Sequence, residues 1–197
     1  MIPATINLLP FDGTADYHGK ILSPAQAQHY MDRLMKHIEW RNDEATIFGR
    51  HIITKRKVAW YGDDNYSYAY SGHTRQALHW TEDLLELKSF IEQRTGKRFN
   101  SCLLNLYHDG DEGMAWHSDD EKTLEKDGAI ASLSLGAERK FSFRHRQSGQ
   151  TLALQLEPGS LLVMRGTTQT YWLHALPKSK KVRDPRINLT FRNMLIP

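Results

Sequence analysis

The sequence has little cysteine and no long apolar stretch, and both shortages narrow the class of protein. Cys102 is the single cysteine among 197 residues, which excludes a disulfide framework and a cysteine-based zinc cluster. Its neighbours in Ser101–Leu104 predict a buried core thiol. No apolar run approaches the roughly 20 residues that span a bilayer. Residues 1–9 lack the features of a secretion signal, so we expect a cytoplasmic protein if bacterial, or a nuclear one if eukaryotic.

Neither sign of charge predominates. The 26 Lys and Arg residues exceed the 23 Asp and Glu residues by three, a mild excess that does not predict a partner by itself. An apolar content of 40% and a charged content of 25% are typical of a globular protein. The sequence shows neither an internal repeat nor a low-complexity segment. We therefore predict one domain over residues 1–197, long enough to bury a core without disulfides.

The first half of the chain carries two helical patterns. Ser23-Pro24-Ala25-Gln26 is a capping-box sequence with proline at the first helical position, and apolar residues follow at helical spacing to Ile38. A second helix is expected from Thr81 to near Gly96. Between them, residues 46–73 are rich in Ile, Val, Tyr and Trp and contain turn signals, which predicts hairpins.

From about residue 100 the pattern changes to short strands. These are expected at residues 101–107, 129–135, 139–146, 151–156, 160–165, 171–175 and 186–194. Many short, closely spaced strands indicate a sandwich or barrel, a group that includes jelly rolls. The predicted class is α+β, mainly β. The chain then divides into an N-terminal extension with a helix (1–45), hairpins (46–80), a supporting helix (81–98) and a strand-rich core (99–197).

Three residues form the ligand set of an iron site. His117 and Asp119 stand at alternate positions of an extended segment, so their side chains can point the same way. His174 follows 55 residues after Asp119 and must be brought in by the fold. Two imidazoles and one carboxylate bind Fe(II) on one face and leave other positions open. Because the chain has ten histidines, an isolated His-x-Asp could also be a surface pair.

Alternation along two predicted strands groups further polar residues. The last strand places on one face Arg186, Asn188, Thr190 and Arg192, and strand 101–107 places on one face Leu103, Asn105 and Tyr107. Arginine clamps a carboxylate through paired donors. The arginines therefore predict a pocket for an anionic co-substrate, although the strand pattern alone also allows them to face solvent.

These motifs, in this order, resemble the AlkB family of iron- and 2-oxoglutarate-dependent nucleic-acid dioxygenases. The matching segments are Asn105–Gly110, His117–Glu121, Ala131–Ala137, Pro158–Leu162 and Pro185–Arg192. The resemblance covers roughly residues 46–194 and is closest to the double-strand-preferring DNA repair homologues. It implies a double-stranded β-helix (jelly roll) core, preceded by N-terminal helices and a nucleotide-recognition hairpin lid within residues 46–80.

The resemblance also implies roles for the candidate residues. Fe(II) would be held by the catalytic residues His117, Asp119 and His174. The co-substrate 2-oxoglutarate, used together with O₂, would be contacted by Asn105, Tyr107, Arg186, Asn188 and Arg192. Of these, Arg186 would bind the distal carboxylate, and Arg192 would lie beside the metal-side carboxylate.

A buried oxidant reaches a base of a duplex only after the base flips out. By resemblance, Tyr70 would stack on the flipped base opposite His117, Phe48 would fill the gap in the duplex, and Glu121 would lie near the exocyclic nitrogen. Other expected substrate contacts are Arg56, Tyr68, Ser71 and Asp120. Core packing is the alternative for Phe48, Tyr66 and Tyr68, and a surface charge for Glu121.

Two basic segments could contact nucleic acid. Residues 45–62 contain no acidic residue and carry a local +4, which predicts a phosphate-contacting ridge of Arg50, Lys55, Arg56 and Lys57. Residues 177–185 contain Lys178, Lys180, Lys181 and Arg183; we expect a solvated loop there, and a specific nucleic-acid contact is the alternative.

The predicted function is oxidative demethylation repair of N1-methyladenine and N3-methylcytosine in DNA, with release of formaldehyde, succinate and CO₂. We expect a monomer that acts on duplex and single-stranded DNA, with RNA as a further candidate substrate. One alternative is a demethylase acting mainly on RNA or single strands. Another is a small-molecule or protein hydroxylase on the same fold. A non-catalytic nucleic-acid-binding module should lack a metal ligand, and this chain has all three candidates.

Overall fold

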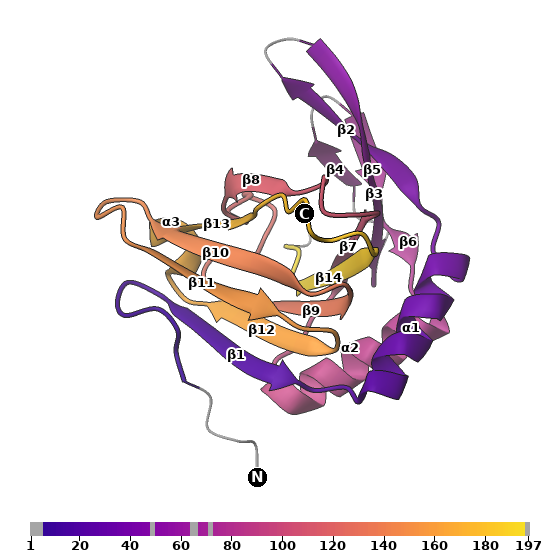
Figure 1. Ribbon diagram of the computed structural model, residues 1–197, viewed down its shortest axis with the longest axis horizontal. Helices are drawn as coiled ribbons and strands as arrows, with labels where there is room; N and C mark the ends of the chain where they lie inside the picture. Colours follow the sequence, from indigo (N-terminus) through magenta and orange to yellow (C-terminus); the bar gives the residue numbers. More distant parts are fainter. Residues whose placement is uncertain (1–5, 48–49, 64–66, 71–72, 196–197) are drawn as a thin grey trace.

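Two β-sheets face each other, and two helices cover the outer side of the larger sheet (Figure 1). The computed structural model describes residues 6–47, 50–63, 67–70 and 73–195. Side chains are not described for residues 45–50, 52 and 67–75. Within the described residues, no helix is long and apolar enough to cross a membrane.

The larger sheet carries most of the fold. Its strands, in spatial order, are β1 (Thr14–Lys20), β12 (Ser160–Arg165), β9 (Ile130–Gly136), β14 (Arg186–Arg192), β7 (Ser101–Tyr107), β3 (Arg50–Gly62) and β2 (Arg41–Ile47). Its neighbouring strands are antiparallel, while the short β6 (Leu78–His79) pairs with β3 in parallel.

The smaller sheet forms the other wall. Its order is β11 (Thr151–Leu156), β10 (Arg139–His145), β13 (Trp172–Leu176) and β8 (Met114–His117). A separate hairpin joins β4 (Ser67–Tyr70) to β5 (His73–Gln76). The β2–β3 hairpin projects away from the body of the molecule at the top of Figure 1. The predicted α+β, mainly β, jelly-roll class is confirmed.

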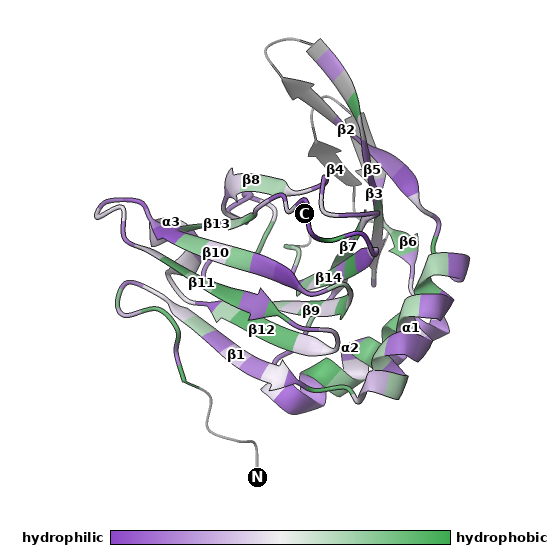
Figure 2. Ribbon diagram, viewed as in Figure 1, coloured by the Kyte–Doolittle hydropathy of each residue, from purple (hydrophilic) through white to green (hydrophobic). Residues whose placement is uncertain are grey.

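The helices begin and end where their capping residues require. In α1 (Pro24–His37) the Ser23 side chain accepts from the backbone of Gln26 and the Gln26 side chain accepts from the backbone of Ser23, which is the predicted capping box. Helix α2 (Glu82–Thr95) ends at Gly96, whose φ of 66° is the left-handed conformation favoured by glycine. Figure 2 shows hydrophilic and hydrophobic bands alternating along α1, as expected of an amphipathic helix.

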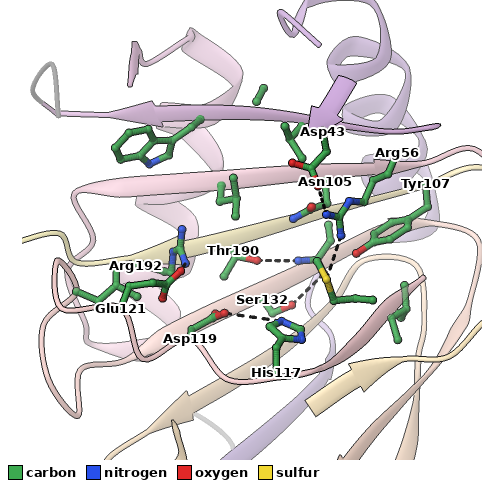
Figure 3. Close-up of a pocket in the computed structure, with 18 of the residues that line it drawn as sticks. Asp43, Arg56, Asn105, Tyr107, His117, Asp119, Glu121, Ser132, Thr190 and Arg192 are labelled. Carbon is green, nitrogen blue, oxygen red and sulfur yellow. Dashed lines mark hydrogen bonds and ion pairs between the residues drawn. The ribbon is translucent and has the colours of Figure 1, made fainter. Parts of the chain in front are cut away.

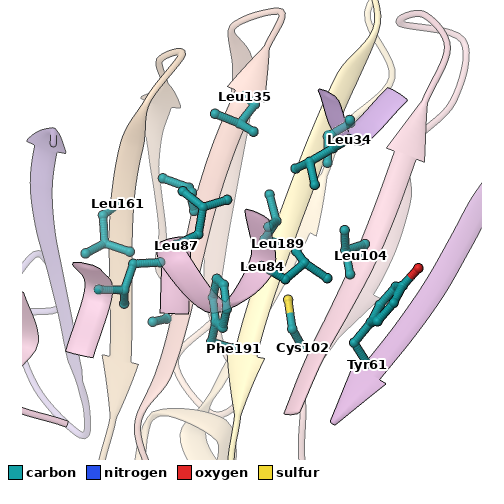
Figure 4. Packing of buried hydrophobic residues seen from close by; sticks show 14 of the residues in the cluster. Leu34, Tyr61, Leu84, Leu87, Cys102, Leu104, Leu135, Leu161, Leu189 and Phe191 are labelled. Atoms are coloured by element: carbon teal, nitrogen blue, oxygen red, sulfur yellow. The ribbon is translucent and has the colours of Figure 1, made fainter. Parts of the chain in front are cut away.

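The main core lies between these helices and the larger sheet (Figure 4). Leu34 of α1 and Leu84 of α2 belong to the same buried cluster as Leu104 and Phe191 of the sheet. Each fully buried side chain of this size stabilises the fold by roughly 1.5–3 kcal/mol. Cys102 is fully buried here, as predicted, and burial raises the pKa of its thiol, so it is an inert core residue.

A second core lies between the two sheets. It joins Phe143 and Trp172 of the smaller sheet to Leu162 and Met164 of β12. The Trp172 indole N–H donates to the carbonyl oxygen of Phe11 at 3.0 Å, so the N-terminal segment is bound to this wall. This apolar packing fills one part of the space between the two sheets. The polar residues of the facing strands lie in the remaining part.

The predicted elements agree with the structure apart from four differences. Strand β8 was expected only as an extended segment at His117 and Asp119. Strand β1, which pairs with β12, was not predicted, although Ala15 and Tyr17 alternate with polar residues along it. The short helix α3 (Thr168–Tyr171) was also not expected. Strand β2 begins at Arg41, so the first hairpin starts earlier than the predicted 46.

Gly110 allows two loops beside the smaller sheet to approach each other. Its backbone N–H donates to the Val182 carbonyl and its carbonyl accepts from Ser179. A Cβ at Gly110 would lie 1.9 Å from the Ser179 carbonyl oxygen. We predict that Gly110→Ala lowers the free energy of unfolding by more than about 1 kcal/mol, measured by urea denaturation. Gly149→Ala, which meets only open space, is the control for backbone strain alone, and an equal loss in both would contradict the steric explanation.

Candidate active site

A cavity of about 980 Å³ opens between the two sheets and the β2–β3 hairpin. One wall is the inner face of β7 and β14, and the opposite wall contains β8 and β13. The polar face predicted for β14, with Arg186, Asn188, Thr190 and Arg192, lines this cavity, as do Leu103, Asn105 and Tyr107 of β7. The arginines therefore point inward and not to solvent.

His117, Asp119 and His174 meet in this cavity. Each offers one ligand atom, and these atoms lie within 4.8 Å of one another. The Asp119 Oδ1 atom is 3.9 Å from His117 Nε2 and 4.0 Å from His174 Nε2. His117 and His174 are direct cross-strand partners in the β8–β13 pairing, which is how the fold brings the late histidine to the His-x-Asp segment.

The environment prepares both imidazoles to bind a metal. His117 Nδ1 lies 2.8 Å from the Ala115 carbonyl oxygen, so the proton belongs on Nδ1 and the lone pair on Nε2. His174 stacks on Phe141, with ring centroids 5.5 Å apart. Burial lowers the pKa of His174 to about 4, which keeps this imidazole neutral and able to donate a lone pair at neutral pH.

The carboxylates of the site have different electrostatic surroundings (Figure 3). Burial by itself would raise the pKa of Asp119, but the charge of Arg192 and the two imidazoles outweigh it and hold the pKa below its usual value. Asp119 is therefore an anionic ligand. Burial raises the pKa of Glu121, although its Oε1 lies 3.6 Å from Arg192 Nη1.

Arg186 forms the opposite end of the site. Its side chain is buried, with the residue 2% exposed, and its Nη2 donates to Ser134 Oγ at 2.9 Å and to Asn188 Oδ1 at 2.7 Å. Its guanidinium also lies 5.5 Å from the centroid of the Tyr107 ring. Burial lowers the pKa of Arg186 to about 10, so it remains a cation at neutral pH.

This arrangement fits Fe(II) and 2-oxoglutarate. Among the described residues, Arg186 has no carboxylate contact and its buried Nε has no hydrogen-bond partner, so a buried cation is available for an anionic ligand. His117, Asp119 and His174 would hold the metal, which supplies an open coordination face for the keto acid and O₂. Arg186 and Tyr107 would orient the far end of the keto acid.

The predicted substrate contacts are placed unevenly. Glu121 lines the cavity, whereas Asp120 does not; the Asp120 side chain is 65% exposed and lies 3.8 Å from Arg146 Nη2. Phe48 and Ser71 lie outside the described residues. The backbone of Tyr68 and Tyr70 forms β4, but their side chains are outside the described part.

Arg56 is not part of an exposed basic ridge. Its side chain is only 12% exposed and forms an ion pair with Asp43 of β2. Its Nη1 lies 3.1 Å from the sulfur of Met114, and its guanidinium lies 5.9 Å from the centroid of the Tyr107 ring (Figure 3). Arg56 therefore lines the cavity as the partner of Asp43, which lies outside the acid-free segment, and its contact with substrate stays a prediction.

Several site residues were missed by the sequence reasoning. Ser132 and Ser134 of β9 line or support the cavity, and Ser132 Oγ donates to Asn188 Oδ1 at 3.0 Å. The alternation of serine with apolar residues in Ile130–Gly136 was a usable signal for this face. Asp43 and Met114 had no such signal, because only the tertiary fold brings them to the cavity.

Fold and site together define an oxygenase that uses a metal and a keto acid, and comparison with known proteins agrees. Residues 14–192 match the family model described as "2OG-Fe(II) oxygenase superfamily". The DNA oxidative demethylase ALKBH2 of Bos taurus is 38% identical over 186 residues, which cover 89% of this chain and 67% of that protein. The solved "structure of OsALKBH1" matches with a TM-score of 0.59 at 16% identity, covering 94% of this chain and 99% of that one, which supports the fold alone.

A second group of relatives is equally similar. The human alpha-ketoglutarate-dependent dioxygenase alkB homolog 3 is 38% identical over 179 residues, covering 86% of this chain. This chain spans about 62% of the length of that relative. The chain belongs to the AlkB family within the 2OG-Fe(II) oxygenase superfamily. It is an Fe(II)- and 2-oxoglutarate-dependent dioxygenase, as the sequence motifs predicted.

We predict that His117→Ala, Asp119→Ala and His174→Ala each abolish conversion of 2-oxoglutarate to succinate, because two ligands cannot hold the metal in an open facial site. Succinate is measured with Fe(II) and ascorbate present. His29→Ala, on the exposed side of α1, is the control and should retain full activity. Turnover retained by two of the three ligand variants would contradict the assignment.

We predict that Arg186→Met raises the KM for 2-oxoglutarate by roughly 10- to 100-fold, since a charge-assisted hydrogen bond contributes about 1.5–3 kcal/mol. The KM is obtained from initial rates of succinate formation. Arg183→Ala, in the exposed loop before β14, should leave the KM unchanged. A loss of nucleic-acid affinity without a change in this KM would show that Arg186 is misassigned.

Proposed function

We propose that this protein repairs alkylated DNA by oxidative demethylation of N1-methyladenine and N3-methylcytosine. The observation that carries the proposal is the continuous cavity, which runs from the ligand triad to the β2–β3 hairpin. A volume of about 980 Å³ lies at the upper end of the range for small-molecule sites, so it can hold a base beside the co-substrate. The relatives named as DNA oxidative demethylases support the same substrate class.

One carboxylate of the cavity, Glu121, suits this substrate. Methylation at N1 of adenine or N3 of cytosine leaves the base cationic at neutral pH. Five carboxylates line the cavity, namely Glu39, Asp43, Glu44, Asp119 and Glu121, together with four arginines, namely Arg41, Arg56, Arg186 and Arg192. Of the carboxylates, Glu121 extends from the segment that carries Asp119, which supports its role as a hydrogen-bond acceptor for the exocyclic amine of a bound base.

The reaction balances with the groups already described. One oxygen atom of O₂ enters succinate as 2-oxoglutarate loses CO₂, and the other enters the N-methyl group. The resulting N-hydroxymethyl base then breaks its N–C bond to release formaldehyde and the unmodified base. The protein's part is to orient 2-oxoglutarate through Arg186 and Tyr107, and to keep Asp119 ionised beside the two imidazoles.

The test is a panel of oligonucleotides that carry one N1-methyladenine, N3-methylcytosine or undamaged base, as single-stranded DNA, duplex DNA and RNA. With Fe(II), 2-oxoglutarate and ascorbate, mass spectrometry should show loss of one methylene unit from the two methylated DNA substrates. Demethylation of RNA alone would favour the RNA alternative. Succinate formation without any demethylation in the panel would favour a small-molecule or protein hydroxylase.

Phe48 supports the choice of duplex DNA on sequence grounds, since an apolar residue in a hairpin turn can replace a flipped base. We predict that Phe48→Ala lowers the rate on duplex more than on single-stranded substrate. Ile53→Ala removes an exposed apolar side chain from β3 of the same hairpin and is the matched control. An equal loss of rate on both substrates would remove the wedge argument.

A further inference from the structure

Gln169 of α3 contacts the metal-ligand segment from outside the cavity. Its Oε1 accepts a hydrogen bond from the backbone N–H of Asp119, with an N···O distance of 3.0 Å. Strand β8 ends at His117, so Asp119 follows the strand and is not held by strand pairing. The contact with Gln169 therefore acts on the one ligand whose backbone the sheet does not position.

Gln169 is itself held firmly. Its neighbour Thr168 is fully buried, and the Thr168 hydroxyl accepts from the backbone N–H of Thr14 at 2.8 Å and lies 2.7 Å from the Arg165 carbonyl oxygen. The Gln169 Nε2 lies 3.6 Å from the sulfur of Met164. Because the amide nitrogen points to this sulfur, the amide oxygen faces Asp119.

We propose that Gln169 is a positioning residue that holds the Asp119 carboxylate in register with His174. Gln169 and His174 lie five residues apart on one continuous segment, α3 and β13. The segment thus contacts the His-x-Asp sequence twice, once by the strand pairing of His174 with His117 and once by Gln169 with Asp119. These two contacts set the separation of all three ligands before a metal binds.

The positioning has an energetic reason. Asp119 lies beyond the end of β8, so its backbone has no strand partner to fix it. Without the contact to Gln169, the Asp119 segment gains conformational freedom, and metal binding must then order the segment again. Groups that orient metal ligands typically change metal affinity by roughly 10- to 100-fold when they are removed.

The test measures Mn(II) affinity of the full chain without 2-oxoglutarate, by electron paramagnetic resonance titration. Gln169→Leu keeps the size of the side chain but removes the acceptor, and we expect its Kd to rise roughly 10- to 100-fold. Gln169→Asn keeps the amide but is one methylene shorter, and it should also lose affinity. Gln169→Glu keeps an acceptor oxygen of the same reach and should recover most of the affinity.

Two controls separate positioning from other effects. Thr170→Glu adds the same charge at the exposed neighbouring position, and it should not tighten Mn(II) binding if the rescue by Gln169→Glu is due to the acceptor. The metal-free variants should unfold at the same urea concentration as the wild type. Wild-type Mn(II) affinity in Gln169→Leu would overturn the proposal, and so would equal losses in Gln169→Leu and Gln169→Glu. The d–d absorption of the Co(II) form, altered in Gln169→Leu and restored in Gln169→Glu, is the second readout.

Discussion

The pairing of His174 with His117 across β13 and β8 is the constraint on which the site depends. It places two imidazoles from distant parts of the sequence 4.2 Å apart, measured between ring centroids. A slip of one residue in this register would turn one of the rings to the other face of the sheet. Phe141 and Phe143 of β10 belong to the apolar core between the two sheets, and the Phe143 ring contacts the His174 ring. This packing helps to hold the register.

Alternation along β7 and β14 lets one sheet serve both the core and the site. Leu104 and Leu189 face the helices, while Asn105 and Asn188 face the cavity. The buried cation Arg186 is costly for the ligand-free protein because its charge has left water without a carboxylate partner among the described residues. An anionic co-substrate would provide that partner. Its attraction to Arg186 would offset the desolvation cost of burying the guanidinium.

Side-chain contacts join the co-substrate end of the cavity to the base of the β2–β3 hairpin. Arg56 of β3 pairs with Asp43 of β2 inside the cavity wall, and the same guanidinium lies over Tyr107, which also contacts Arg186. The base of the hairpin is thereby bound to the residues expected to orient the keto acid. In the proposed function, this arrangement keeps the substrate base next to the co-substrate, as the reaction requires.

The sequence by itself determined the strand-rich class, the capped helix α1, the residues that share one face of β14 and the three candidate metal ligands. These features are local, or they depend on an ordered motif that a family resemblance can identify. Only the tertiary structure decided that Arg56 turns inward to Asp43, that Asp120 turns outward to Arg146, and that Gln169 binds the backbone of Asp119. Such contacts join residues from separate elements, and alternation along a strand specifies the face of a side chain but not its partner across the fold.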